Sequence, residues 1–446
     1  MVTSVASPPL DVAAAIDGGR WSAYQKLTLV LLALAFAVDG LANQALGLAI
    51  PALVAEWHVP RAAFASIAGA GLVGVTIGAA LGGMVGDRLG RRLGLIGSVL
   101  IFGLATLASA ATRTPGELLM VRFIGGLAIG AALPSGTALI AEFTPVRQRS
   151  LAIAVGMMFI AVGGLLASVL GALVLRPLGW RPYFVIAGAL PLAFAVLFIA
   201  TLPESPLFLA RRPHRRSALL SLLRRAGIDA PADCTLIERT SAQERRPITL
   251  LLQQGMRRNT LALWMGFFFC LLASYTMFSW APTMLTSRGF NVSQSSIGMS
   301  AFSFGGVIGG LLSGWLIGLV GSRRSVLGLA LGAAAGALVL GALARGPTPS
   351  FALLLIALPC EGLFIAGLTN GVYTLAAFIY PPHAKATGVG AAAAIGRIGA
   401  VVSSYTGVLA LQLGGASSYF LVIAIAALLS FIGVAAIRAH VPRVAR

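Results

Sequence analysis

The sequence predicts an all-α integral membrane protein with twelve transmembrane helices in two pseudo-symmetric six-helix halves. The chain has 446 residues, of which 58% are hydrophobic and only 10% charged. Apolar runs recur from end to end, each near the roughly 20 residues that an α-helix needs to cross a bilayer. One long polar stretch, 202–259, lies between two equal sets of these runs.

The apolar runs define the predicted organisation of the chain. Residues 1–24 form a tail, 25–201 the N-terminal half, 202–259 a basic linker, 260–437 the C-terminal half and 438–446 a second tail. The twelve predicted spans are 25–50, 63–86, 93–112, 117–142, 150–175, 181–201, 260–285, 295–319, 325–345, 350–378, 386–411 and 416–437.

The basic residues predict the orientation of the chain. Segments that fall on the side of the two tails hold 24 of the 32 Lys and Arg residues, and the opposite loops hold 6. Because basic residues concentrate in cytoplasmic loops, both termini are expected in the cytoplasm of a cell whose inner membrane the chain crosses. The net charge of +19 therefore indicates orientation and contact with anionic lipids rather than nucleic-acid binding.

No catalytic or cofactor motif is present. The four histidines are widely separated, and the sequence has no metal-ligand spacing, no nucleophile elbow and no phosphate-binding loop. We therefore expect neither an enzyme nor a bound cofactor. Because no nucleotide-binding motif is present, any movement of a solute by such a membrane protein would be passive or driven by a gradient.

The two halves echo each other, which indicates a duplicated unit. Gly83–Arg92 aligns with Gly314–Arg323, and Gly90 with Gly321, whereas Asp87 is replaced by Gly318. Parallel repeats around an axis along the membrane normal place a substrate site near the midplane between halves.

Charged residues inside predicted spans are candidate site residues, since one charge at the bilayer centre costs about 2.5–3.5 kcal/mol. Asp39 lies near mid-depth with Asn43 on the same helix face, and it is a candidate proton site. Arg122 and Arg397 are candidates to capture an anion, because a guanidinium matches a carboxylate and stays charged. The alternative is internal pairing of these arginines with Asp39 or Glu361.

Helices seven and ten carry further candidates. Tyr275 and Trp280 could stack on a planar ligand, although packing is the usual role of such rings. Glu361 is a second proton site or a structural partner for an arginine. Asn370 is a candidate ligand contact, but an ideal helix places it on the side opposite Glu361.

The basic turn at the inner end of helix two predicts a gate. A salt bridge between Glu142, at the inner end of helix four, and Arg88 or Arg91 is plausible; a solvated helix end is the alternative. The predicted gating residues are Gly83, Asp87, Arg88, Gly90, Arg91 and Glu142.

Several segments together resemble one family. They begin at Asp39-Gly-Leu-Ala-Asn, Arg122-Phe-Ile-Gly-Gly, Leu202-Pro-Glu-Ser-Pro, Thr387-Gly-Val-Gly and Gly396-Arg-Ile-Gly. With the basic turn, they resemble the aromatic acid:proton symporters of the major facilitator superfamily, carriers of benzoate and hydroxybenzoates. The resemblance covers essentially the whole chain.

The resemblance implies the major facilitator fold and import of a small organic anion with protons, by a monomer. Asp39, Arg122, Glu142 and Arg397 match charged positions of that family. Its first helix carries a second acid where this chain has Ala42, which leaves proton coupling open. The alternatives are a carrier of sugars or other organic ions, a drug exporter, and a membrane sensor that uses the 202–259 loop.

Overall fold

The computed structural model describes residues 10–228, 236–237, 251–253, 256–345, 350–380 and 384–443. These residues are helical apart from turns, loops and one short parallel pair, β1 (Leu10–Asp11) with β2 (Leu236–Ile237). Within the described ranges, eleven helices are long and apolar enough to cross a membrane. The last of them is two helices joined at Gly414 and Gly415, so the prediction of twelve spans in an all-α protein is confirmed.

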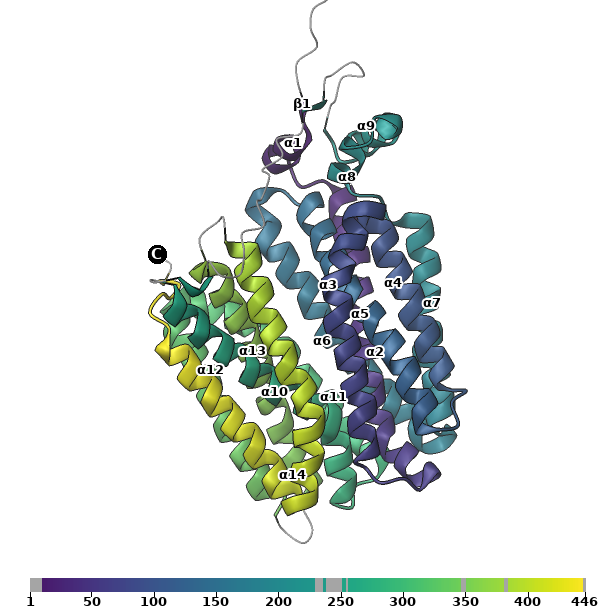
Figure 1. The fold of residues 1–446 in the computed structure, drawn as a ribbon, viewed down its shortest axis with the longest axis vertical. Coiled ribbons are helices and arrows are strands. Elements are labelled where there is room, and N and C mark those ends of the chain that lie inside the picture. The colour runs from purple at the N-terminus through teal and green to yellow at the C-terminus, as the bar shows by residue number, and fades with distance from the viewer. Residues whose placement is uncertain are drawn as a thin grey trace, which may run out of the picture.

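The helices alternate in direction through the molecule. The N-terminal bundle is α2 (Ala23–Trp57), α3 (Ala63–Leu89), α4 (Arg91–Ser109), α5 (Pro115–Phe143), α6 (Val146–Leu178) and α7 (Trp180–Thr201). The C-terminal bundle is α10 (Arg257–Ser287), α11 (Val292–Val320), α12 (Ser322–Leu343), α13 (Phe351–Ile379) and α14 (Lys385–Ala436). Short helices α1 (Val12–Gly18), α8 (Pro206–Ala210) and α9 (Arg216–Arg225) lie outside the bundles (Figure 1).

Figure 1 shows α1, α8 and α9 at the end of the N-terminal bundle from which α2 starts. We call this end of the molecule, where the α3–α4 and α11–α12 turns also lie, the terminal face, and the opposite end the distal face.

Local sequence explains where the helices begin and end. Ser22 and Asn291 open α2 and α11 with capping boxes, in which side chains satisfy N–H groups that lack helical partners. Gly90 and Gly321 end α3 and α11 with φ of 112° and 82°, a region that glycine adopts without steric penalty. These glycines are equivalent in the two halves, as the predicted repeat requires.

The same kind of close helix contact at a glycine occurs within each bundle. A Cβ on Gly78 would lie 1.9 Å from the Leu127 carbonyl oxygen, where α3 meets α5, and one on Gly305 would lie 1.8 Å from the Pro359 oxygen, where α11 meets α13. In a bilayer, small residues let helices approach closely enough for strong van der Waals packing. The bundles are thus built on the same contacts.

The buried apolar clusters show how the two bundles meet. One large cluster joins them near the distal face and includes Leu53 and Trp180 from one bundle and Trp280 and Met284 from the other. Toward the terminal face, each bundle has a separate cluster of its own. The halves are therefore packed together at the distal end and form independent cores at the terminal end.

A glycine substitution tests the close packing. Gly163→Ala in α6 is expected to destabilise the protein by about 1–3 kcal/mol, because its Cβ would lie 1.9 Å from the Ala37 oxygen of α2. Gly97→Ala in α4 is the matched control, since that Cβ meets nothing within 4 Å. Thermal unfolding of the purified protein measures both; equal melting temperatures would contradict the packing account.

Candidate functional site

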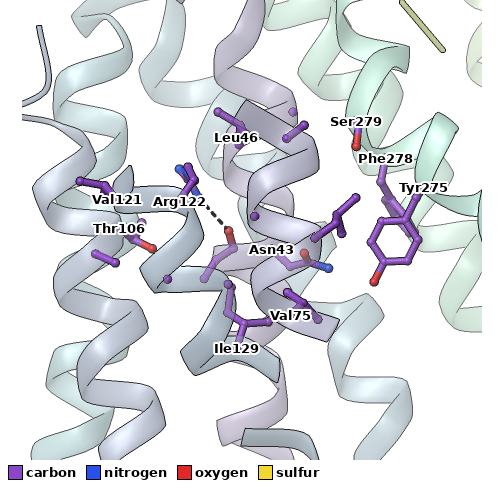
Figure 2. Close-up of a pocket in the computed structure, with 18 of the residues that line it drawn as sticks. Asn43, Leu46, Val75, Thr106, Val121, Arg122, Ile129, Tyr275, Phe278 and Ser279 are labelled. Atoms are coloured by element: carbon purple, nitrogen blue, oxygen red, sulfur yellow. Dashed lines mark hydrogen bonds between the residues drawn. The ribbon is translucent and has the colours of Figure 1, made fainter. Parts of the chain in front are cut away.

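A cavity of about 60 Å³ lies between the bundles, lined by α2, α3, α4 and α5 from one side and α10 from the other. Its polar lining consists of Asn43, Thr106, Arg122, Tyr275 and Ser279 (Figure 2). The volume is well below the roughly 300–1000 Å³ of pockets that hold small-molecule ligands. A ring-sized ligand would therefore require the walls to move apart.

Arg122 of α5 is the one arginine in the lining of this cavity. Its side chain is buried, its Nη1 donates to the Ala42 carbonyl oxygen at 3.5 Å, and the guanidinium lies 4.8 Å from the centre of the Phe184 ring. Its Nε and Nη2 are buried without a hydrogen-bond partner among the residues that the structure describes. None of the salt bridges among the described residues includes it, so an anion could complete its hydrogen bonding.

Asp39 lies one helical turn before Asn43 on α2 and is 3% exposed. Within the described part of the chain, its Oδ1 has no hydrogen-bond partner and its carboxylate makes no salt bridge. Arg397 of α14 acts electrostatically on Asp39, while its Nη1 donates to the Val75 carbonyl oxygen of α3 at 3.4 Å. Neither Asp39 nor Arg397 is in the lining of the cavity. The direct pairing that the sequence left open does not occur among the salt bridges of the described residues.

Of the two predicted stacking aromatics, the structure brings one to the cavity. Tyr275 is in the lining, whereas Trp280 is fully buried in the distal apolar cluster. A Cβ on Gly407 of α14 would lie 2.4 Å from the Trp280 ring, so Trp280 fills the space that this glycine leaves. Phe278 and Ser279 are cavity residues that the sequence analysis did not single out.

Glu361 and Asn370 are not in the cavity lining. Glu361 is fully buried with both carboxylate oxygens unpartnered, and it faces α12, where a Cβ on Gly336 would lie 2.3 Å from its Oε2. Asn370 donates from Nδ2 to the Gly310 carbonyl oxygen of α11 at 3.3 Å. Both side chains are directed toward other helices of the C-terminal bundle.

The basic turn between α3 and α4 forms a charge network inside the N-terminal bundle. Arg91 pairs with Asp87 on the turn and lies 3.9 Å from Glu142 of α5. Glu142 accepts a hydrogen bond from the Ser205 hydroxyl, and Glu204 accepts one from the Arg92 N–H at 3.0 Å. The network therefore ties three segments of one bundle together at the terminal face.

The other predicted gating residues take simpler roles. Arg88 is exposed, and its carbonyl oxygen accepts a bond from Arg212 at 2.9 Å. A Cβ on Gly83 would meet nothing within 4 Å, whereas one on Gly90 would lie 2.4 Å from the Glu204 carboxylate. Glu204 and Ser205 were missed as site residues, although the Pro-Glu-Ser-Pro segment that holds them was evident.

Among the described residues, the equivalent turn of the C-terminal bundle has no salt bridge of this kind. Ser322, directly after Gly321, donates its N–H to the Val441 carbonyl oxygen at 3.0 Å and accepts the Val441 N–H at 2.8 Å. Hydrogen bonds from the Ser322 main chain and to its hydroxyl oxygen thus tie this turn to the C-terminal segment, where Gly318 has replaced the acid. The two copies have diverged in what stabilises them.

Sequence comparison places the chain among transporters. It is 34% identical to a gallate transporter of Pseudomonas putida, over 91% of this chain and 90% of that protein. It is 31% identical to the 4-hydroxybenzoate transporter PcaK of Pseudomonas aeruginosa, with the same coverage. These similarities confirm the resemblance to aromatic acid carriers.

Structural comparison agrees on the fold. The inward open xylose transporter XylE from E. coli superposes with a TM-score of 0.72 at 20% identity, covering 93% of this chain and 97% of that one. The family model described as Major Facilitator Superfamily matches residues 32–298 and 262–446. The chain therefore belongs to the major facilitator superfamily of membrane transporters.

Proposed function

We propose that the protein imports a small aromatic carboxylate across the inner membrane together with protons, by alternating access between its two bundles. The observation that carries this proposal is the buried guanidinium of Arg122, with two nitrogens unpartnered at a cavity between the bundles. The substrate class follows the relatives, which are named as transporters of gallate and 4-hydroxybenzoate.

The cavity offers the contacts that a hydroxylated benzoate needs. A carboxylate could accept hydrogen bonds from the free nitrogens of Arg122, a charge-assisted interaction about twice as strong as a neutral one. The ring would pack against Tyr275, and the Asn43 amide and the Ser279 and Thr106 hydroxyls could bind ring hydroxyl groups. We infer that binding widens the cavity by moving α10 away from α2.

Proton coupling is assigned to Asp39. A charged Asp39 would hold Arg397, which acts on it electrostatically from the opposite bundle. A proton on this carboxyl group would release Arg397 and leave its charge available to the substrate anion. Since Ala42 stands where the family has a second acid, we propose that this one carboxyl group carries the coupled proton.

The terminal face is assigned to the cytoplasm, because most Lys and Arg residues lie in segments on that side. The bundles share one apolar core at the distal face and have separate cores at the terminal face. This arrangement suits an inward-facing state. The charge network of Arg91, Glu142 and Ser205 would then stiffen the N-terminal bundle while the bundles rock.

Asp39→Asn tests the proton site. We expect purified Asp39→Asn protein in liposomes to lose the stimulation of 4-hydroxybenzoate uptake by an inwardly directed proton gradient, because an amide cannot exchange the proton. Uptake of labelled acid with and without the gradient measures this effect.

Glu361→Gln is the matched control, since Glu361 is an equally buried acid that lies against α12 within the C-terminal bundle. This variant is expected to keep the stimulation. Gradient-stimulated uptake by Asp39→Asn would show that Asp39 is not the proton site. Loss of the stimulation only in Glu361→Gln would assign the proton site to Glu361 instead. Wild-type uptake that ignores the gradient would remove symport itself.

Variants of Tyr275 and Trp280 distinguish a side chain that contacts the ligand from one that only packs. Tyr275→Ala is expected to raise the KM for uptake about two- to tenfold, the loss of one aromatic contact of 0.5–1.5 kcal/mol. Trp280→Phe should leave KM unchanged but lower the melting temperature, because it opens a void beside Gly407. Kinetics and thermal unfolding measure both variants; an altered KM only in Trp280→Phe would contradict the site.

A further inference from the structure

A second cavity, of about 490 Å³, lies between the bundles at the distal face. Its walls come from the ends of α2, α6 and α10 and the start of α11, together with Arg61 from the loop before α3. The volume is within the roughly 300–1000 Å³ typical of small-molecule sites. We call this cavity, with Arg61, Arg176 and Thr283 in its lining, the distal vestibule.

The distal vestibule and the central cavity lie in series along the same helix faces. On α2 the central cavity uses Asn43 and Gly47, and the vestibule uses Pro51 and Val54. Residues three or four apart share one face of a helix. Thus α2 forms a continuous wall that runs from one cavity into the other.

The same holds on α10, where Tyr275 and Ser279 line the central cavity and Thr283 and Thr286 line the vestibule. Between the cavities the two helices touch: a Cβ on Gly47 would lie 2.4 Å from the Phe278 carbonyl oxygen. The vestibule therefore lies on the distal side of this contact between α2 and α10.

Two unpaired cations make the vestibule attractive to anions. Arg61 is half-buried and Arg176 exposed, and neither side chain has a hydrogen bond or salt bridge within the described part of the chain. The nearby acid Glu56 is already engaged, because its carboxylate pairs with Arg181 and accepts the Trp180 Nε1–H at 2.6 Å. Glu56 therefore does not neutralise the positive charges of Arg61 and Arg176.

The vestibule also holds a polar group without a partner. Thr283 is 1% exposed, and its buried hydroxyl has no hydrogen-bond partner in the described ranges. Buried hydroxyls are ordinarily hydrogen-bonded, so this one is available to a molecule in the cavity. Phe290 and Leu175 add an apolar surface suited to a ring.

We propose that the distal vestibule is a second binding site for the aromatic carboxylate, which loads the central cavity when the contact between Gly47 and Phe278 opens. The proposal rests on the proposed substrate class. Arg61 and Arg176 would hold the carboxylate, and Thr283 would bind a ring hydroxyl. A cleft lined by one sign of charge also raises the local concentration of the opposite ion.

The test is import of labelled 4-hydroxybenzoate into right-side-out vesicles by the double variant Arg61→Gln/Arg176→Gln. We expect its KM to rise about tenfold, the lower end of the effect of charge focusing, with an unchanged maximal rate. Wild-type KM should increase with added KCl, and that of the double variant should not. Efflux from the same vesicles should keep its KM.

Arg113→Gln is the matched control, since Arg113 is an exposed arginine in the distal loop before α5 and is outside the vestibule lining. It should behave as wild type, and the double lysine variant at Arg61 and Arg176 should retain the salt sensitivity. An unchanged KM in the double glutamine variant, or an equal change in Arg113→Gln, would overturn the proposal.

Binding separates failure of the vestibule from failure of the proposed function. In Arg122→Gln protein in nanodiscs, ligand-observed NMR should still detect salt-sensitive binding of 4-hydroxybenzoate, and adding the two vestibule substitutions should remove it. Absence of that binding would overturn the vestibule even if transport is intact. If salt-sensitive binding is present but the wild type transports no aromatic acid, the vestibule stands as a binding site and the proposed function is refuted.

Discussion

The site depends on two ionisable side chains that are buried within membrane-spanning helices without a salt bridge among the described residues. Asp39 and Arg122 are 3% and 9% exposed, and neither forms a salt bridge with another described residue. A buried unpaired charge is expensive, at about 2.5–3.5 kcal/mol on insertion scales. A protein can retain such groups where a ligand pairs with one of them or a proton neutralises the other during the working cycle. For this reason we place the site at Asp39 and Arg122.

The surrounding packing keeps these groups in place and apart. Gly40, next to Asp39, meets the main chain of Ile160, and Gly47 meets that of Phe278. Both contacts hold α2 tightly against α6 and α10, which fixes the position of the main chain that carries Asp39. The distal apolar cluster joins the bundles around these contacts, whereas the separate terminal cores leave the bundles free to part at the other face.

Much of this organisation could be predicted from the sequence, because long apolar runs, capping residues and turn glycines act locally. Asn43, Arg122 and Tyr275 were recognisable because polar groups are rare in such spans. Glu361 and Trp280 show the limit: each is covered by a helix distant in the chain, at Gly336 and Gly407 respectively. Periodicity gives the face of a helix, but it does not give the neighbour that covers that face.

The central claim is that substrate binding and protonation of Asp39 are one linked event. Calorimetry of 4-hydroxybenzoate binding to the purified protein, in buffers of different ionisation enthalpy, measures the protons taken up on binding. The account predicts net uptake of protons by the wild type and none by Asp39→Asn. If the wild type binds without proton uptake at every pH at which the protein is folded, the account is contradicted.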